Sequence, residues 1–99
     1  MTGNFEELIS SGNPVLIDFS AEWCKPCRKI DAMLYQLADE LDEDIEIIKI
    51  DVDKNTALRK KYKIDAVPTL ILFHNSKQIW RHTGLISVPE VVKAVNQAL

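Results

Sequence analysis

Extended and helical patterns of apolar residues alternate along the chain. Residues 14–21 (PVLIDFSA) are nearly all apolar and rich in β-forming side chains, which is typical of a strand buried on both faces. Residues 45–53 (IEIIKIDVD) read as a second strand. Two further strands, 69–74 and 78–84, flank the polar segment NSK and predict an antiparallel hairpin.

Helical spacing of apolar residues predicts four helices between and around these strands. The longest spans residues 26–41, where apolar side chains recur every three or four positions and charged residues fill much of the opposite face. Shorter helices are expected over 4–9 and 55–62, and Ser87 with Glu90 forms a capping box that opens the last one. The order α-β-α-β-α-β-β-α predicts an α/β fold with one mixed sheet and helices on both faces.

Length and composition restrict the chain to a single soluble domain, residues 1–99. Apolar residues make up 46% and charged residues 27%, with a net charge of −3 and cations interleaved among anions. Nucleic-acid binding is disfavoured because it needs clustered cations. No apolar run approaches the roughly 20 residues that span a bilayer. The segment MTGNFEELIS does not resemble a secretory signal, so a cytoplasmic protein is expected.

The chain has two cysteines, Cys24 and Cys27, within the segment EWCKPCRK. Such a pair can be a structural disulfide, half of a metal site or a redox catalyst. As a structural disulfide it would be weak, because closing a four-residue loop contributes only about 2 kcal/mol to stability. A structural zinc site needs four ligands, and His74 and His82 are eight residues apart, outside the usual spacing. The redox interpretation is therefore favoured, with no metal expected.

The position of the pair supports that interpretation. Cys24 and Cys27 fall where the first strand ends and the long helix begins. Unpaired backbone N–H groups and the positive end of the helix dipole favour a thiolate there. Cys24, nearer the solvent end, is the expected nucleophile, and Cys27, one turn inward, is the expected resolving thiol.

The segments DFSAEWCKPC and AVPT, some forty residues apart, give the chain a clear resemblance to the thioredoxin family. The similarity is collinear from Phe5 to Leu99. It implies the thioredoxin fold and protein-disulfide reductase activity without a metal or organic cofactor. The family's first strand has no counterpart here, so we expect a four-stranded mixed sheet flanked by four helices. The resemblance also implies disulfide-containing protein substrates and a flavin-dependent thioredoxin reductase as electron donor. A lone domain of this size is expected to be a monomer.

Two charged residues acquire roles through the resemblance. Asp18 lies in an otherwise apolar strand, where a buried carboxylate is costly unless it is paired or protonated. Taken alone, it could equally be a strand-end aspartate that reaches solvent. The family resemblance makes it the buried proton acceptor for Cys27, directly or through water. Lys49, in the neighbouring strand, would be its electrostatic partner, although a solvated strand lysine would look the same.

The resemblance also implies a docking surface for substrate. Pro68 would form a cis peptide bond, which the sequence alone cannot predict because about 5–6% of X-Pro bonds are cis. This bond would expose the backbone of Val67 for pairing with an extended substrate segment. Gly84 would allow close approach. An apolar rim would be formed by Trp23, Pro26, Val67 and Leu85.

Lys25 departs from the family, which usually has glycine between the cysteines. As a solvated lysine it would have no effect, but a cation beside Cys24 should stabilise the thiolate and make the couple more oxidising. It also lies on the docking surface. Two other functions stay open: an oxidase or isomerase in an oxidising compartment, which the missing signal disfavours, and a non-catalytic module that presents Val67 and Pro68 to one partner.

Overall fold

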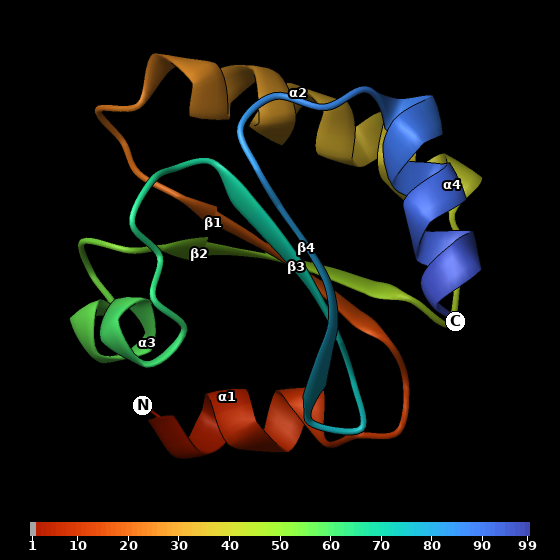
Figure 1. The fold of residues 1–99 in the computed structure, drawn as a ribbon, viewed down its shortest axis with the longest axis horizontal. Coiled ribbons are helices and arrows are strands. Elements are labelled where there is room, and N and C mark those ends of the chain that lie inside the picture. Colours follow the sequence, from red (N-terminus) through yellow and green to blue (C-terminus); the bar gives the residue numbers. More distant parts are fainter. Residues whose placement is uncertain (1) are drawn as a thin grey trace.

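The computed structural model describes residues 2–99, with side chains from Phe5 onward. Its elements follow the predicted order (Figure 1): α1 (Thr2–Ile9), β1 (Val15–Ser20), α2 (Lys25–Glu40), β2 (Glu46–Asp51), α3 (Thr56–Lys61), β3 (Thr69–His74), β4 (Lys77–Thr83) and α4 (Val88–Ala98). The bounds differ from the predicted ones by at most two residues. The prediction of an α/β chain with four strands and four helices is confirmed for residues 2–99.

The strands form one mixed sheet in the order β2-β1-β3-β4. β1 pairs in parallel with β2, from Val15 opposite Glu46 to Ser20 opposite Asp51. It pairs antiparallel with β3, which in turn pairs antiparallel with β4. β1 is therefore an inner strand, and all six of its residues are buried, as the continuous apolar run predicts.

Helices cover both faces of this sheet, with α2 and α4 on one side and α1 and α3 on the other (Figure 1). Alternate residues of β1 contribute to two separate core clusters. Val15, Ile17 and Phe19 pack in the cluster that includes residues of α1 and α3. Leu16 packs in the cluster that includes residues of α2 and α4. Because side chains alternate across a strand, Asp18 points to the same face as Leu16, toward α2.

The β3–β4 hairpin is tighter than the sequence suggests. Asn75 and Ser76 have φ angles of 52° and 68°, and Lys77 already belongs to β4. A two-residue turn with both φ angles positive matches the twist of the flanking strands. The predicted three-residue connection is thus wrong by one residue. The predicted capping box is present, since Ser87 Oγ accepts from the Glu90 N–H at 3.3 Å.

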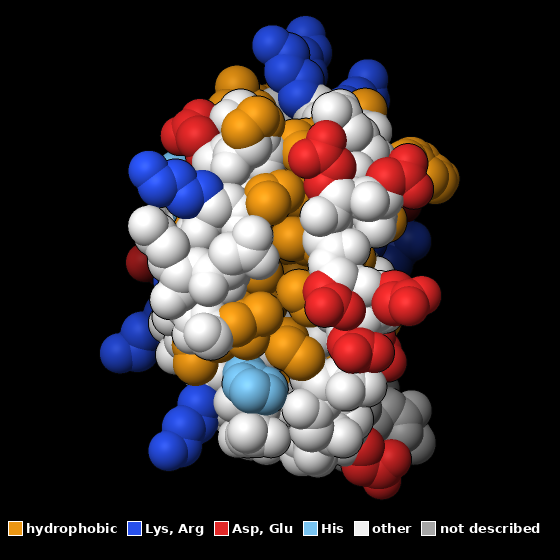
Figure 2. Space-filling model, turned by 90° about the vertical axis from the view of Figure 1, so that its right-hand side faces the viewer, with side chains coloured by type: hydrophobic (Ala, Val, Ile, Leu, Met, Phe, Trp, Pro, Cys, Tyr) orange, Lys and Arg blue, Asp and Glu red, His pale blue; other side chains and the backbone are white. Residues whose placement is uncertain are grey.

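The surface combines apolar and acidic areas. Figure 2 shows, on the side of the molecule where α4 lies, a band of apolar side chains with acidic side chains along one flank. Exposed acidic residues are concentrated where α2 ends and leads into β2: Asp39, Glu40, Asp42, Glu43, Asp44 and Glu46. Within residues 2–99, every helix is too short or too polar to cross a bilayer.

Candidate active site

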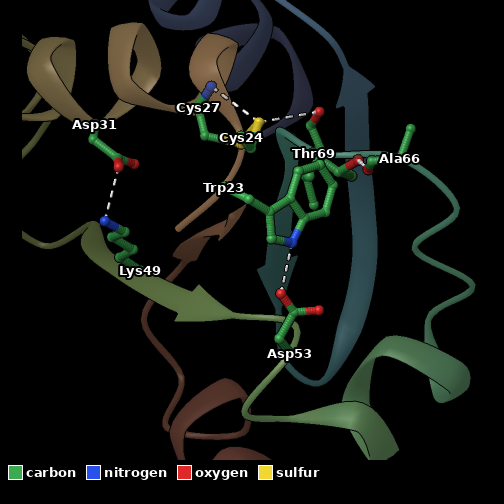
Figure 3. The surroundings of a disulfide bond; sticks show 9 residues. Trp23, Cys24, Cys27, Asp31, Lys49, Asp53, Ala66 and Thr69 are labelled. Carbon is green, nitrogen blue, oxygen red and sulfur yellow. Dashed lines mark hydrogen bonds and ion pairs between the residues drawn. A yellow bond between two sulfur atoms is a disulfide. The ribbon is translucent and has the colours of Figure 1, made fainter. Parts of the chain in front are cut away.

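Cys24 and Cys27 form a disulfide at the start of α2 (Figure 3), with Cα atoms 5.3 Å apart. Cys24 is the N-cap of the helix, and its sulfur accepts a hydrogen bond from the Cys27 N–H at 3.2 Å. Both residues are buried, with exposed fractions of 3% and 1%. Lys25 and Pro26, between them, are exposed. The predicted placement at a strand–helix junction is confirmed.

Local sequence explains why the sulfur takes the N-cap position. β1 ends at Ser20, and the Cys24 N–H then donates to the Ala21 carbonyl at 3.2 Å, which closes a turn before the helix. Pro26 fits the first helical turn because its missing N–H has no partner to lose there. The Cys24 sulfur therefore faces backbone donors and the positive end of the helix dipole, which favour a thiolate.

The Val67–Pro68 segment packs against this sulfur. Their peptide bond is cis, as the family resemblance implies. The Val67 carbonyl oxygen lies 3.6 Å from Cys24 Sγ. In the disulfide, Sγ has no proton and the approach is only a contact, whereas the reduced thiol could donate to this oxygen. The Gly84 N–H donates to the Pro68 carbonyl at 2.9 Å, and the φ of +100° at Gly84 is one that glycine adopts without strain.

The expected apolar rim is accessible. Trp23 and Leu85 have exposed fractions of 65% and 52%, unusually high for large apolar side chains. The indole N–H of Trp23 donates to Asp53 Oδ2 at 2.7 Å (Figure 3). Asp53 in turn lies 3.5 Å from Arg59 Nη1. Sequence reasoning missed Asp53, because the residue is 30 positions away and follows β2 without any distinctive local pattern.

Asp18 is completely buried in β1, so the interpretation as a solvent-reaching aspartate is wrong. Neither carboxyl oxygen has a hydrogen-bond partner within 3.5 Å among the described residues. Burial is the main reason that the pKa of Asp18 rises from 3.8 to about 8. Nearby Asp31 raises this pKa further, while the Lys49 cation lowers it.

Lys49 lies opposite Asp18 in the β1–β2 pairing, but its ammonium binds elsewhere. Lys49 Nζ lies 2.7 Å from Asp31 Oδ2 in α2 (Figure 3). This ion pair raises the pKa of Lys49, mainly through the hydrogen bond to Asp31. Sequence reasoning missed Asp31. The available signal was its position four residues after Cys27, which places both side chains on one face of the helix.

A hollow of about 600 Å³ lies beside this ion pair. Ser20 and Ala21 line it together with six charged residues: Glu22, Arg28, Asp31, Lys49, Asp51 and Lys54. Asp31 is partly exposed there, with a side-chain exposed fraction of 25%, although its Oδ1 is buried. Asp31 therefore connects the buried surroundings of Asp18 with a polar, solvent-facing surface.

The remaining candidates are structural. His74 ends β3, and His82 lies in β4 with Nε2 3.1 Å from the Leu85 carbonyl oxygen, so both are strand residues as predicted. Trp80 in β4 is half-buried and packs against the core cluster that includes residues of α2 and α4. Between residues 2 and 99, no three His, Cys, Asp or Glu side chains cluster in a way that could hold a metal ion.

Known proteins with similar sequences are named thioredoxins. The thioredoxin family model matches residues 1–97. Over 97 residues the chain is 36% identical to the chloroplastic thioredoxin Y of Oryza sativa subsp. japonica, covering 97% of this chain but only 58% of that protein. It is 34% identical to a thioredoxin of Rickettsia bellii, covering 92% of this chain and 87% of the relative.

Solved structures agree with the sequence comparison. A mutant thioredoxin from Halobacterium salinarum NRC-1 superposes with a TM-score of 0.87 at 32% identity, covering 97% of this chain and 83% of that one. Members of this family are thiol–disulfide oxidoreductases, and the chain has the cysteine pair that this chemistry uses. The chain belongs to the thioredoxin family.

Proposed function

We propose that this chain is a protein-disulfide reductase that works by dithiol–disulfide exchange. One observation carries the proposal: Cys24 and Cys27 form a disulfide at the N-terminus of α2, where the Cys27 N–H donates to Cys24 Sγ. A disulfide that closes so short a loop contributes little to stability. Its placement instead favours the thiolate that nucleophilic exchange requires.

In the first step, the Cys24 thiolate of the reduced protein attacks one sulfur of a substrate disulfide. A bond forms between Cys24 Sγ and that sulfur, and the other substrate sulfur leaves as a thiolate. The backbone N–H of Cys27 and the helix dipole stabilise the attacking thiolate. The product is a mixed disulfide between Cys24 and the substrate.

In the second step, Cys27 resolves the mixed disulfide. Its proton passes to the Asp18 carboxylate, and the Cys27 thiolate attacks Cys24 Sγ. The Cys24–Cys27 bond forms as the bond to substrate breaks, so two electrons pass from the cysteine pair to the substrate. Because the pKa of Asp18 is raised to about 8, the fraction of Asp18 in the carboxylate form increases as the pH rises through neutrality. Resolution should therefore accelerate over the same range.

The substrate would bind across the Val67–Pro68 segment. The Val67 carbonyl already faces Cys24 Sγ, and the backbone of Val67 could pair with an extended segment of the substrate. Main-chain pairing demands no particular side chain from the partner, which suits varied disulfide-containing proteins. Around this segment, contact would come from Trp23, Lys25, Pro26, Gly84 and Leu85.

The oxidised protein must be reduced again, and by family analogy a thioredoxin reductase supplies the electrons. No cofactor beyond the disulfide is required for exchange. We place the protein in a reducing compartment such as the cytoplasm, because its only two cysteines form the redox pair and none is left for a structural disulfide. Residues 1–99 would act as a single, monomeric thioredoxin domain.

The proposal is tested by reduction of insulin disulfides with dithiothreitol as electron source. Cys24→Ser should lower the rate to that of dithiothreitol alone, since the sulfur that attacks the substrate disulfide in the first step is lost. Cys27→Ser should instead accumulate a mixed disulfide through Cys24, visible by mass spectrometry. A wild-type rate no higher than dithiothreitol alone, or an active Cys24→Ser variant, would contradict the proposal, and binding without turnover would favour a non-catalytic module.

A further inference from the structure

Two carboxyl groups and one cation come together where α2 packs over β1 and β2. Asp18 comes from β1, Lys49 from the register position opposite it in β2, and Asp31 from α2. The only ion pair in this described group joins Lys49 Nζ to Asp31 Oδ2 at 2.7 Å. Both oxygens of Asp18 and the second oxygen of Asp31 are buried and, within residues 5–99, accept no hydrogen bond.

This arrangement determines where the cation acts. Lys49 could neutralise Asp18, its neighbour across the sheet, but its ammonium is held by Asp31 on the side of the solvent-facing hollow. The side chain of Lys49 has an exposed fraction of 52%, so its field at the buried Asp18 is weakened by water. Asp18 thus has a second carboxylate beside it and a cation that binds that carboxylate.

We propose that Asp31 is a positioning residue for proton transfer from Cys27: from α2 it binds the ammonium of Lys49, the register neighbour of Asp18, and so determines how readily Asp18 accepts that proton. This inference rests on the proposed function, in which Asp18 accepts the Cys27 proton. Asp31 would touch neither the substrate nor the sulfurs. It acts only by changing how readily Asp18 ionises.

The charged groups around Asp18 support a dominant role for Asp31. From α2, Asp31 acts on the Asp18 carboxyl, and Arg28 lines the hollow beside the Lys49–Asp31 ion pair. From β2 come Lys49 and Asp51, and the adjoining loops add Glu22 and Lys54 to the lining. From β3, the register neighbour is the apolar Leu70. After burial, Asp31 is the main cause of the raised pKa of Asp18, and Lys49 opposes it.

Asp18 must be ionised to accept the Cys27 proton, so Asp31 slows resolution at neutral pH and moves it to higher pH. Removing the Asp31 charge should lower the midpoint of Asp18 ionisation by roughly one pH unit, both by ending the repulsion and by releasing Lys49. A shift from about 8 to about 7 would raise the ionised fraction at pH 7 about fivefold.

The first measurement needs no activity. Carboxyl ¹³C NMR follows the ionisation of Asp18 in the oxidised protein between pH 4 and 10, for the wild type and for Asp31→Asn. Asp39→Asn is the matched control, because it removes an exposed carboxylate from the same helix. The expected result is an acid shift of roughly one unit in Asp31→Asn and none in Asp39→Asn. An unchanged Asp18 midpoint in Asp31→Asn would overturn the inference.

The second measurement links Asp18 to resolution. Stopped-flow Trp23 fluorescence follows a single turnover of the reduced protein with a peptide disulfide over the same pH range. Asp31→Asn should shift the pH profile of the resolving phase by the same amount and raise its rate about fivefold at pH 7. In an Asp18→Asn background, Asp31→Asn should leave the pH profile of the resolving phase unchanged. A similar shift in that background would show that Asp31 acts without Asp18 and would overturn the inference.

The two proposals fail separately. If the wild type does not reduce disulfides at any pH, the proposed function fails, and the NMR titration still measures what Asp31 does to Asp18. If the wild type is active and Asp31→Asn changes neither titration nor profile, only the role of Asp31 fails. Circular dichroism of each variant verifies that the fold is retained.

Discussion

The start of α2 stabilises negative charge, whereas the surroundings of Asp18 destabilise it. At the start of α2, the sulfur of Cys24 accepts from the Cys27 N–H and lies at the positive end of the helix dipole. In β1, the buried carboxyl of Asp18 has no hydrogen-bond donor among the described residues, and Asp31 of α2 further opposes its ionisation. The first surroundings favour an anion and the second oppose one.

In the proposed mechanism, this difference would allow one small domain to hold a Cys24 thiolate and a protonated Asp18 at neutral pH. Both groups are buried, so burial alone would oppose charge on either. Backbone donors offset that cost only at the helix terminus, where N–H groups have no intrahelical partner. Asp18, in the middle of a paired strand, has no such donors because the backbone groups there bond to neighbouring strands.

The largest expected effect is on the free energy of unfolding, and it comes from the buried Asp18. The pKa of Asp18 is raised on folding, so the folded state binds a proton that the unfolded state releases above pH 4. Stability should therefore fall as the pH rises from about 4 to about 8. Asp18→Asn should remove this loss and stabilise the oxidised protein at pH 9 by on the order of 5 kcal/mol, with little change at pH 4.

Urea unfolding of wild type and Asp18→Asn at pH 4 and 9 measures this effect. Asp39→Asn is the control, because an exposed carboxylate should change stability little at either pH. Equal stability of Asp18→Asn and wild type at pH 9 would mean that Asp18 is not protonated on folding. The contrast between the start of α2 and the surroundings of Asp18 would then be lost.

An intermediate effect is expected at the start of α2, on the reduction potential of the cysteine pair. Lys25 is exposed between the cysteines, and a cation there is expected to stabilise the Cys24 thiolate and so the reduced form. If that stabilisation is about 1.4 kcal/mol, Lys25→Gly should lower the reduction potential by about 30 mV.

Equilibration of Lys25→Gly in dithiol/disulfide buffers, read by Trp23 fluorescence, gives the reduction potential. Lys29→Gln, which removes an exposed cation one turn further along α2, should change it less. An unchanged potential in Lys25→Gly would show that backbone donors alone determine the thiolate stability.

The smallest effect should come from Lys49. Its cation lowers the pKa of Asp18, but the side chain is half-exposed and paired with Asp31. Lys49→Met should therefore raise the pKa of Asp18 by roughly half a unit, because solvent already screens the cation. Carboxyl ¹³C NMR of the oxidised protein measures the shift. A fall in this pKa would mean that Lys49 does not act as a cation toward Asp18.

Much of the fold could be predicted because its signals are local. The continuous apolar run before the cysteines indicated an inner strand, and Ser87 with Glu90 indicated the start of α4. The hairpin turn was misjudged by one residue, because Asn75 and Ser76 reach positive φ only when the paired strands demand that twist. The cis bond at Pro68 was implied by the family resemblance and not by local sequence.

Less of the site could be predicted, because its contacts join distant segments. Trp23 and Asp53 are 30 residues apart, Cys24 and Val67 are 43 apart, and Lys49 and Asp31 are 18 apart. Lys49 was expected to pair with Asp18, its neighbour in the sheet. The packing of α2 over β2 brings Asp31 within reach instead, and a partly exposed carboxylate is a less costly partner for a half-exposed ammonium than a buried one.

The sequence by itself determined the redox pair and its setting. Two cysteines separated by one helical turn, after an inner strand and before an amphipathic helix, must meet the helix N-terminus, because strand and helix patterns are properties of contiguous residues. Only the tertiary structure decided which charges surround Asp18. Electrostatic interactions depend on distance and burial in space, and the strands and helix that supply Asp18, Lys49 and Asp31 meet only when the chain has folded.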